Sequence, residues 1–278
     1  MIQLIQFYFK TIGNVFPKAI ANQAFKLFAK VRKKEIRKRE LPFFEQAKKY
    51  NLPFNSGSLD CYAFGKPTKD IVVLVHGWDS NVGCMYQLAT ALAKEGKYCI
   101  GFNLPAHAFY KEKQSNIFIC KEAFKTVLNN LPEYTHLSIL SHSFGSVVTA
   151  YGLSELDVKI DKLVFQTSPN YLKDVFLEFK GLVALPNAVY AHLKNKAEAI
   201  INEDLDKLAT ETKLKGANFK HLYLFHDKYD KVIPFSKSEE IHNAISNSTL
   251  LPYEKVGHYR MLFNENIIAK TVEILMPI

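Results

Sequence analysis

The feature that most limits the possible folds is a regular alternation of short apolar runs and longer helical segments after residue 59. The clearest run, Ile71 to Val75, is a continuous series of β-branched residues and Leu, which is typical of a strand buried on both faces. The alternation predicts an α/β fold with a mostly parallel central sheet flanked by helices. The expected strands are residues 59–64, 71–75, 98–102, 136–140, 162–165, 221–225 and 250–253, and the expected helices are 85–94, 117–131, 144–153 and 267–275.

One long stretch interrupts this alternation. Residues 169–216 have helical periodicity and contain no run that is typical of a strand. A structureless loop of that length is improbable inside a compact domain, so we expect an inserted helical cap. The predicted organisation is a helical segment at 1–50, a core formed by 51–168 and 217–278, and the cap at 169–216.

The positive charge of the chain is concentrated at its N-terminal end. The chain carries 36 Lys and Arg against 27 Asp and Glu, and residues 1–50 hold 12 of these basic residues but only three of the acidic ones. The formal excess of +9 therefore lies entirely in this segment. Apolar residues recur there at three- and four-residue intervals, which predicts an amphipathic helix interrupted near Gly13 and Pro17.

Two interpretations of this basic segment remain open. Its helix could pack on the main domain and leave a solvated basic face, which is the commoner situation. It could instead contact the surface of an anionic membrane, as basic amphipathic helices with Phe and Leu do. Nucleic acid is not expected as a partner, because no recognised motif accompanies the charge. No apolar run approaches the ~18 residues of a membrane span and no secretory signal is visible, so a cytoplasmic location is expected.

The sharpest local motif is Ser141-His142-Ser143-Phe144-Gly145, which directly follows an expected strand and directly precedes an expected helix. A serine on such a tight turn adopts strained backbone angles and projects out of the backbone. A serine hydroxyl is a poor nucleophile by itself and needs a base within hydrogen-bonding reach. The motif therefore makes Ser143 a candidate nucleophile.

This motif resembles the nucleophile elbow G-x-S-x-G of the α/β-hydrolase superfamily, with Ser141 in place of the first glycine. In that family an acid and then a histidine follow the serine along the chain. The segment DKVIP, which begins at Asp230, resembles the family's acid loop, so Asp230 is the expected acid and nearby Asp227 is the alternative. Gly257-His258 resembles the family's G-H loop, which makes His258 the expected base.

The resemblance also implies an oxyanion hole. His76-Gly77-Trp78 follows the strand expected at 71–75 and resembles the family's H-G-x loop, so the two donors would be the main-chain amides of Trp78 and Phe144. The Trp78 side chain could border the acyl pocket or could equally be part of the core. The residues expected to line the substrate pocket are Trp78, Phe144, Phe176 and Phe179, and those expected to support the site are His76, Gly77 and Gly145.

One loop departs from the family pattern. Residues 103–108 occupy the place of the family's D-x-P-G-H-G-x-S loop, with Asn103, Ala106 and Ala108 in place of the aspartate and the two glycines. Because residues with a Cβ atom disfavour positive φ, we expect this loop to avoid such angles at both alanines.

The resemblance implies a serine esterase that cleaves a carboxylic ester, or a related acyl bond of a small molecule, through an acyl-enzyme on Ser143. One alternative is a catalytically inactive binding protein of the same fold, which the departures at Ser141, Ala106 and Ala108 suggest. Another is a thioesterase or lipid-acyl hydrolase acting at a membrane surface. No metal or organic cofactor is expected, because the four cysteines are widely spaced and no metal or phosphate-binding motif is visible.

Overall fold

The computed structural model describes residues 2–33 and 35–276, and the chain divides into two compact units. Unit 1 contains Met1–Lys30 and Tyr171–Ala209, and unit 2 contains Val31–Asn170 and Thr210–Ile278. Each unit therefore combines segments that are far apart in the sequence.

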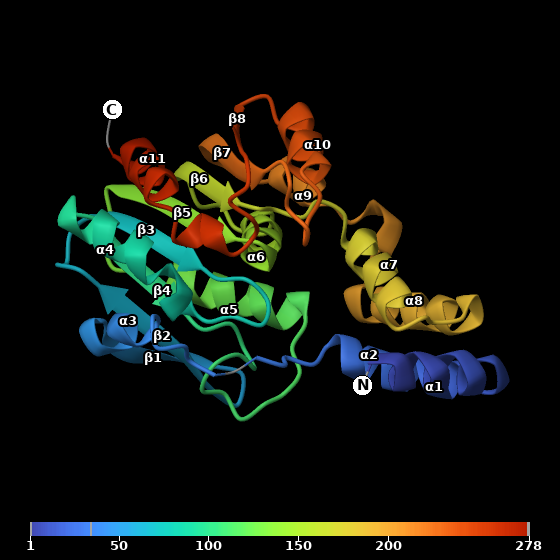
Figure 1. The fold of residues 1–278 in the computed structure, drawn as a ribbon. Coiled ribbons are helices and arrows are strands. Elements are labelled where there is room, and N and C mark those ends of the chain that lie inside the picture. Colours follow the sequence, from blue (N-terminus) through green and yellow to red (C-terminus); the bar gives the residue numbers. More distant parts are fainter. Residues whose placement is uncertain (1, 34, 277–278) are drawn as a thin grey trace. The chain divides into compact units, whose positions relative to one another are not determined.

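Unit 2 is built on one sheet. Its strands are β1 (Lys48–Phe54), β2 (Gly57–Phe64), β3 (Asp70–Val75), β4 (Tyr98–Phe102), β5 (His136–His142), β6 (Ile160–Gln166), β7 (Phe219–Asp227) and β8 (Ser248–Tyr253). Among the residues described, the sheet has eight strands in the order β1-β2-β4-β3-β5-β6-β7-β8 (Figure 1). β2 is antiparallel to both β1 and β4, whereas β3 to β8 run parallel to one another. The mostly parallel sheet predicted from the sequence is confirmed.

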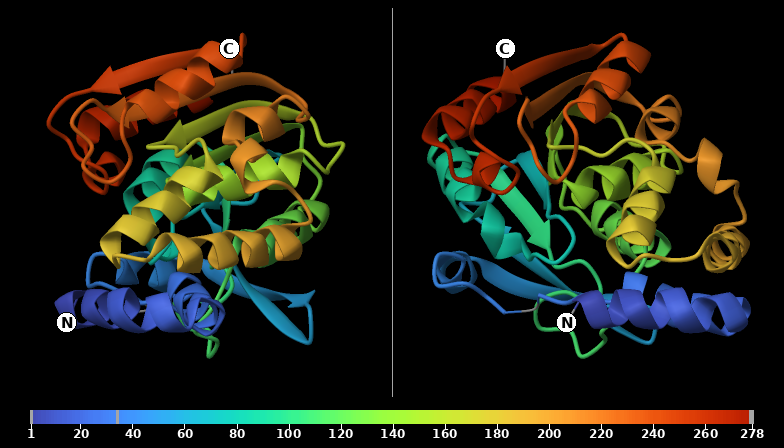
Figure 2. Two further views of the ribbon diagram at one scale, coloured as in Figure 1. Left: turned by 90° about the vertical axis from the view of Figure 1, so that its right-hand side faces the viewer. Right: turned by 45° about the vertical axis from the view of Figure 1, so that its right-hand side comes forward.

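Helices cover both faces of this sheet. They are α3 (Leu41–Gln46), α4 (Tyr86–Lys94), α5 (Ile117–Asn129), α6 (Phe144–Leu153), α9 (Thr210–Leu214), α10 (Ser236–Ala244) and α11 (Glu265–Leu275). α4 packs against α11 on one face, and α5 packs against α6 on the other (Figure 2). Successive residues of a strand point to opposite faces. Val72 and Leu74 therefore join the core beneath α4 and α11, while Val73 points to the opposite face, and all three are fully buried.

The sequence pattern did not predict β1 or α10. β1 is an edge strand that, among the described residues, pairs with β2 alone, and its side chains are exposed or half-buried along its whole length. α10 has the polar sequence SKSEEIHNA, of which only Ser238 and Ile241 are buried. Hydrophobic periodicity reports burial, so elements that bury few side chains give a weak signal.

Unit 1 is helical. Its helices are α1 (Ile2–Val15), α2 (Pro17–Phe28), α7 (Leu172–Leu182) and α8 (Asn187–Ile201). Both α1 and α2 contact α8, and the helix break predicted near Pro17 is present, with Pro17 as the first residue of α2. α1 approaches α8 closely at Gly13, where a Cβ atom would lie 2.9 Å from Val189 Cγ2.

The unit boundaries differ from the predicted ones. We expected a helical segment at 1–50 and a cap at 169–216, whereas 1–30 and 171–209 form one unit. Residues 31–50 belong to unit 2, where they supply α3 and the start of β1. α9 likewise belongs to unit 2 and packs on α6. These assignments depend on contacts between distant segments, which periodicity along the chain does not report.

None of the helices formed by residues 2–33 and 35–276 combines the length and the apolar character that crossing a lipid bilayer requires.

Candidate active site

Ser143 lies on a sharp turn between β5 and α6. Its backbone has φ 52° and ψ −123°, and a positive φ is uncommon and strained for a residue with a side chain. Two hydrogen bonds hold the turn: the Ser143 amide donates to Gln166 O at 2.9 Å, and Ser146 Oγ donates to Ser143 O at 2.6 Å. The strained backbone angles predicted for Ser143 are therefore present, and hydrogen bonds at its amide and its carbonyl stabilise them.

The neighbours of Ser143 allow α6 to approach the end of β3. A Cβ atom at Gly145 would lie 2.3 Å from the carbonyl oxygen of Val75, so no larger residue fits there without movement of the backbone. Ser141, which replaces the family's first glycine, is fully buried, and its hydroxyl lies 2.8 Å from Thr149 Oγ1. The substitution is thus accommodated by a hydrogen bond to the following helix.

The structure brings Ser143, His258 and Asp230 together. His258 Nε2 lies 3.0 Å from Ser143 Oγ, and His258 Nδ1 lies 2.8 Å from Asp230 Oδ2. Both the imidazole and the carboxylate are almost completely buried. The three residues follow the carboxyl ends of the strands β5, β7 and β8. Because these strands are parallel, their carboxyl ends lie on the same side of the sheet. The sheet topology therefore brings Ser143 and His258, which are 115 residues apart in the sequence, into one hydrogen-bonded chain with Asp230.

The Asp230 carboxylate is held in its ionised form. Burial by itself would raise the pKa of Asp230, but hydrogen bonds from His226 and His258 and from the amide of Val232 hold that pKa well below its ordinary value. An ionised Asp230 accepts the Nδ1 hydrogen of His258. The Nε2 lone pair of His258 is then directed at the Ser143 hydroxyl, which is the arrangement that proton removal requires.

Asp227, the alternative acid, occupies a different position. Its Oδ2 accepts a hydrogen bond from the Gly257 amide at 2.5 Å, and its Oδ1 accepts one from the Tyr229 amide at 2.7 Å. Asp227 is completely buried. It therefore anchors the loop that carries His258, while the carboxylate that contacts the imidazole is that of Asp230.

The sequence analysis did not single out His226, which lies at the end of β7. Its Nε2 is 2.9 Å from Ile233 O and 3.5 Å from Asp230 Oδ2, and its Nδ1 is 2.7 Å from Ser238 Oγ. His226 thus contacts the carboxylate and the loop that follows it. The only signal in the sequence is its position four residues before Asp230, which is too weak to identify such a role.

His76 and Leu104 connect the expected oxyanion loop to the loop after β4. His76 Nε2 accepts the Leu104 amide hydrogen at 2.9 Å, and His76 Nδ1 lies 2.8 Å from Gly77 O. Burial, with the neighbouring imidazole of His107, lowers the pKa of His76 well below its ordinary value. A neutral ring that accepts at one nitrogen and donates at the other satisfies both contacts.

A second anchor holds the same loop through the residue after Trp78. Asp79 Oδ1 accepts the Arg32 amide hydrogen at 2.7 Å, and Asp79 Oδ2 lies 3.2 Å from Arg32 Nε.

The Trp78 ring contacts the Phe144 ring edge-to-face at 5.2 Å, and both residues are half-buried. As the first residue of α6, Phe144 has an amide that lacks a carbonyl partner within its own helix.

His142 supports the base from beneath. Its Nε2 lies 3.1 Å from the main-chain oxygen of His258, and the two rings meet edge-to-face at 5.0 Å. Burial, followed by the nearby His258, lowers the pKa of His142 to about 3. The neutral ring donates to His258 O and so helps to hold the loop that carries His258.

The prediction that Ala106 and Ala108 avoid positive φ is wrong. Their φ angles are 70° and 49°, and both residues are buried. The His107 amide donates to Leu104 O at 3.0 Å, and the Tyr110 amide donates to His107 O at 3.2 Å, so local hydrogen bonds maintain the tight turns. Alanine, with the smallest side chain that has a Cβ atom, tolerates these angles at a cost of about 1–2 kcal/mol each.

Phe176 and Phe179, which were expected to line the substrate pocket, lie on α7 in unit 1. Their rings are 4.3 Å and 5.2 Å from the ring of Phe28 on α2. Their contribution to a pocket remains a prediction.

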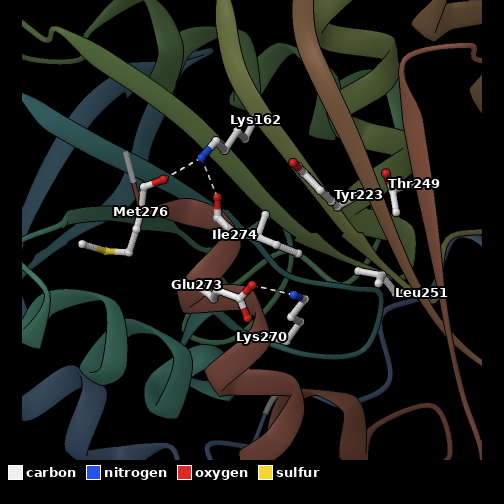
Figure 3. Close-up of a pocket in the computed structure, with 8 residues that line it drawn as sticks. All are labelled: Lys162, Tyr223, Thr249, Leu251, Lys270, Glu273, Ile274 and Met276. Carbon is white, nitrogen blue, oxygen red and sulfur yellow. Dashed lines mark hydrogen bonds and ion pairs between the residues drawn. The ribbon is translucent and has the colours of Figure 1, made fainter. Parts of the chain in front are cut away.

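A pocket of ≈ 320 Å³ lies elsewhere in unit 2, between α11 and the strands β6, β7 and β8 (Figure 3). At one end of it, Lys162 Nζ donates to Ile274 O and to Met276 O, both at 2.6 Å, and so caps the carboxyl end of α11. Ser143, His258 and Asp230 do not line this pocket. Across the residues that the structure describes, no group of three or more His, Cys, Asp or Glu could hold a metal ion.

The sheet, the elbow and the Ser-His-Asp contacts define an α/β hydrolase. Residues 62–247 match the model of a family described as "Alpha/beta hydrolase of unknown function (DUF900)". This match covers more than half of the chain, so the chain belongs to that family.

Comparisons with individual proteins agree with this class. Over 96 residues the chain is 28% identical to "Putative methylesterase 14, chloroplastic" of Arabidopsis thaliana. The aligned region covers 34% of this chain and 28% of the relative, so the chain spans less than a third of that protein's length. The esterase Pf2001 of Pyrococcus furiosus has a TM-score of 0.63 at 20% identity, covering 88% of this chain and 95% of that one. A bromoperoxidase from Bacillus anthracis has a TM-score of 0.64 at 15% identity, covering 82% and 99%. The two structures are similar to this chain in fold.

Proposed function

We propose that this protein is a serine esterase that cleaves carboxylic esters through an acyl-enzyme on Ser143. The observation that carries the proposal is the continuous hydrogen-bonded chain from Ser143 Oγ through His258 to Asp230. Esters are the favoured substrate class because an esterase and a relative named as a methylesterase are among the similar proteins.

In the proposed reaction, Ser143 Oγ attacks the ester carbonyl carbon while its proton passes to His258 Nε2. The negative oxygen of the tetrahedral intermediate receives hydrogen bonds from the amides of Trp78 and Phe144. The intermediate then expels the alcohol, which takes the proton from His258, and leaves an acyl group on Ser143. Water attacks this acyl-enzyme with His258 again as the base, which releases the acid and restores the serine.

Asp230 is assigned a positioning role. Its carboxylate fixes the tautomer of His258 and stabilises the imidazolium that forms during each proton transfer. The low pKa of Asp230 keeps it ionised, so that the transferred proton remains on the imidazole. His142, His226 and Asp227 are also positioning residues in this proposal, because each contacts His258, Asp230 or the loop that carries His258.

The first test compares Ser143→Ala with Ser236→Ala, a change at an exposed serine of α10. We expect Ser143→Ala to lower kcat on nitrophenyl esters by about 10³-fold or more, because the nucleophile is absent, while Ser236→Ala retains wild-type kcat. A fluorophosphonate should label the wild type and Ser236→Ala but leave Ser143→Ala unlabelled. Full activity or labelling of Ser143→Ala would refute the proposal.

The same assays separate the proposal from the alternatives. An inactive binding protein would leave the wild type itself unlabelled by the fluorophosphonate. A thioesterase would turn over acyl thioesters with a higher kcat/KM than oxygen esters of equal chain length.

A further inference from the structure

α1 has apolar side chains on two opposite faces. One face packs inside unit 1: Phe9 is buried, and Gly13 lies against Val189 and Pro186 at the start of α8. A helix on the surface of a soluble protein normally turns a polar face outward. Here the outward face is formed by Leu4, Phe7, Tyr8, Ile12 and Val15, and Phe16 continues it after the last turn.

The exposure of this outward face is large. Leu4 is 74% exposed, Phe7 69%, Val15 64% and Phe16 60%. Positions 4, 8, 12 and 15 are three or four residues apart, and position 7 is three residues from position 4, so all five follow one side of the helix. Single exposed apolar residues are ordinary, but a contiguous stripe of aromatic and aliphatic side chains marks an interaction site.

The charge beside this stripe indicates what it contacts. Residues 2–30 contain no Asp or Glu, and they carry Lys10 within α1 and Lys18 directly after the stripe, both exposed. The other part of unit 1, residues 171–209, contains six acidic residues and five lysines. The net positive charge of unit 1 therefore lies in the N-terminal segment that carries the apolar stripe, and not in residues 171–209.

We propose that the outward face of α1 binds the surface of an anionic lipid bilayer. Leu4, Phe7 and Phe16 would enter the boundary between headgroups and acyl chains, and Lys10 and Lys18 would meet anionic headgroups. α1 contacts the start of α8 at Gly13, so α8 supports the helix on the side opposite the stripe. The surface is contained within unit 1 and does not depend on the proposed esterase activity.

The test measures co-sedimentation of the full chain with vesicles of phosphatidylcholine containing phosphatidylglycerol, and with vesicles of phosphatidylcholine alone. The main variant is Leu4→Gln/Phe7→Gln. The matched control is Leu177→Gln/Ile200→Gln, which removes two exposed apolar side chains from α7 and α8. Circular dichroism confirms that each variant is folded.

We expect the wild type to prefer the anionic vesicles and Leu4→Gln/Phe7→Gln to lower its partition coefficient by about tenfold or more. The control variant should stay within about twofold of the wild type, since its side chains lie outside the stripe. Lys10→Gln/Lys18→Gln should weaken binding to the anionic vesicles by about fivefold per lysine and leave binding to neutral vesicles unchanged.

Two kinds of result would overturn the proposal. One is equal vesicle binding by the wild type and Leu4→Gln/Phe7→Gln, or an equal loss in the Leu177→Gln/Ile200→Gln control. The other is a dimer in solution that Leu4→Gln/Phe7→Gln converts to a monomer, without vesicle binding by either form, because the stripe would then be an interface between two copies of the chain.

Discussion

At the scale of single residues, the two aspartates after β7 show how similar side chains take different positions. Asp230 contacts the His258 imidazole, whereas Asp227 accepts two main-chain amide hydrogens, one of them from Gly257. A buried carboxylate that accepts amide hydrogens stabilises a loop, and one that accepts an imidazole N–H selects a tautomer. The two aspartates should therefore respond differently to the same substitution.

We expect Asp230→Asn to lower kcat by about 10³-fold or more, because an amide group beside His258 Nδ1 favours the wrong tautomer. Asp227→Asn should lower kcat by less than about tenfold and lower Tm by a few degrees, since one amide of the loop loses its acceptor. Ester hydrolysis well below Tm and thermal unfolding measure the two effects. If Asp227→Asn abolished kcat while Asp230→Asn did not, the assignment of the acid would be wrong.

At the scale of elements, the site depends on how closely α6 approaches the end of β3. Gly145 has no room for a Cβ atom because the carbonyl oxygens of Val75 and His76 would lie 2.3 Å and 2.7 Å away. Both contacts are with backbone, which cannot rotate away as a side chain can. Gly181 in α7 is the opposite case, since nothing lies within 4 Å of its Cβ position.

We expect Gly145→Ala to lower the free energy of unfolding by at least about 2 kcal/mol, because α6 must move away from β3. The same displacement shifts the Phe144 amide and should lower kcat. Gly181→Ala should leave kcat unchanged and stabilise the protein by up to about 1 kcal/mol, because alanine favours a helix over glycine. Urea unfolding measures both variants, and equal stability of Gly145→Ala and the wild type would contradict the packing argument.

At the scale of the whole molecule, two buried neutral histidines couple stability to pH. Burial, with neighbouring imidazoles, lowers the pKa of both His76 and His142 in the folded protein. An unfolded histidine takes up a proton below a pH of about 6.5. The unfolded state then binds more protons than the folded state, so the free energy of unfolding falls as the pH falls.

Each of these histidines should reduce the free energy of unfolding by about 1.4 kcal/mol per pH unit once the pH is below about 6. Urea unfolding at pH 7, 6 and 5 measures this slope. His142→Gln removes one titrating group and preserves an N–H donor for His258 O, so it should reduce the slope by about 1.4 kcal/mol per pH unit. An unchanged slope in His142→Gln would show that His142 does not remain neutral in the folded protein.

The sequence by itself determined the class of fold and the residue types of the candidate site. Strands buried on both faces, such as β3, and the elbow at Ser143 leave signals within a few neighbouring residues, because periodicity and tight turns are local properties. The resemblance of three short motifs to a known family then indicated Ser143, His258 and Asp230.

The tertiary structure decided what depends on contacts through space. It placed Asp230 rather than Asp227 beside His258, and His226 behind that carboxylate. It also joined 1–30 to 171–209 in one unit and imposed positive φ on Ala106 and Ala108. Each outcome depends on the packing of segments that are distant in the chain or on the closure of a loop by its own hydrogen bonds, and local residue patterns carry little information about either.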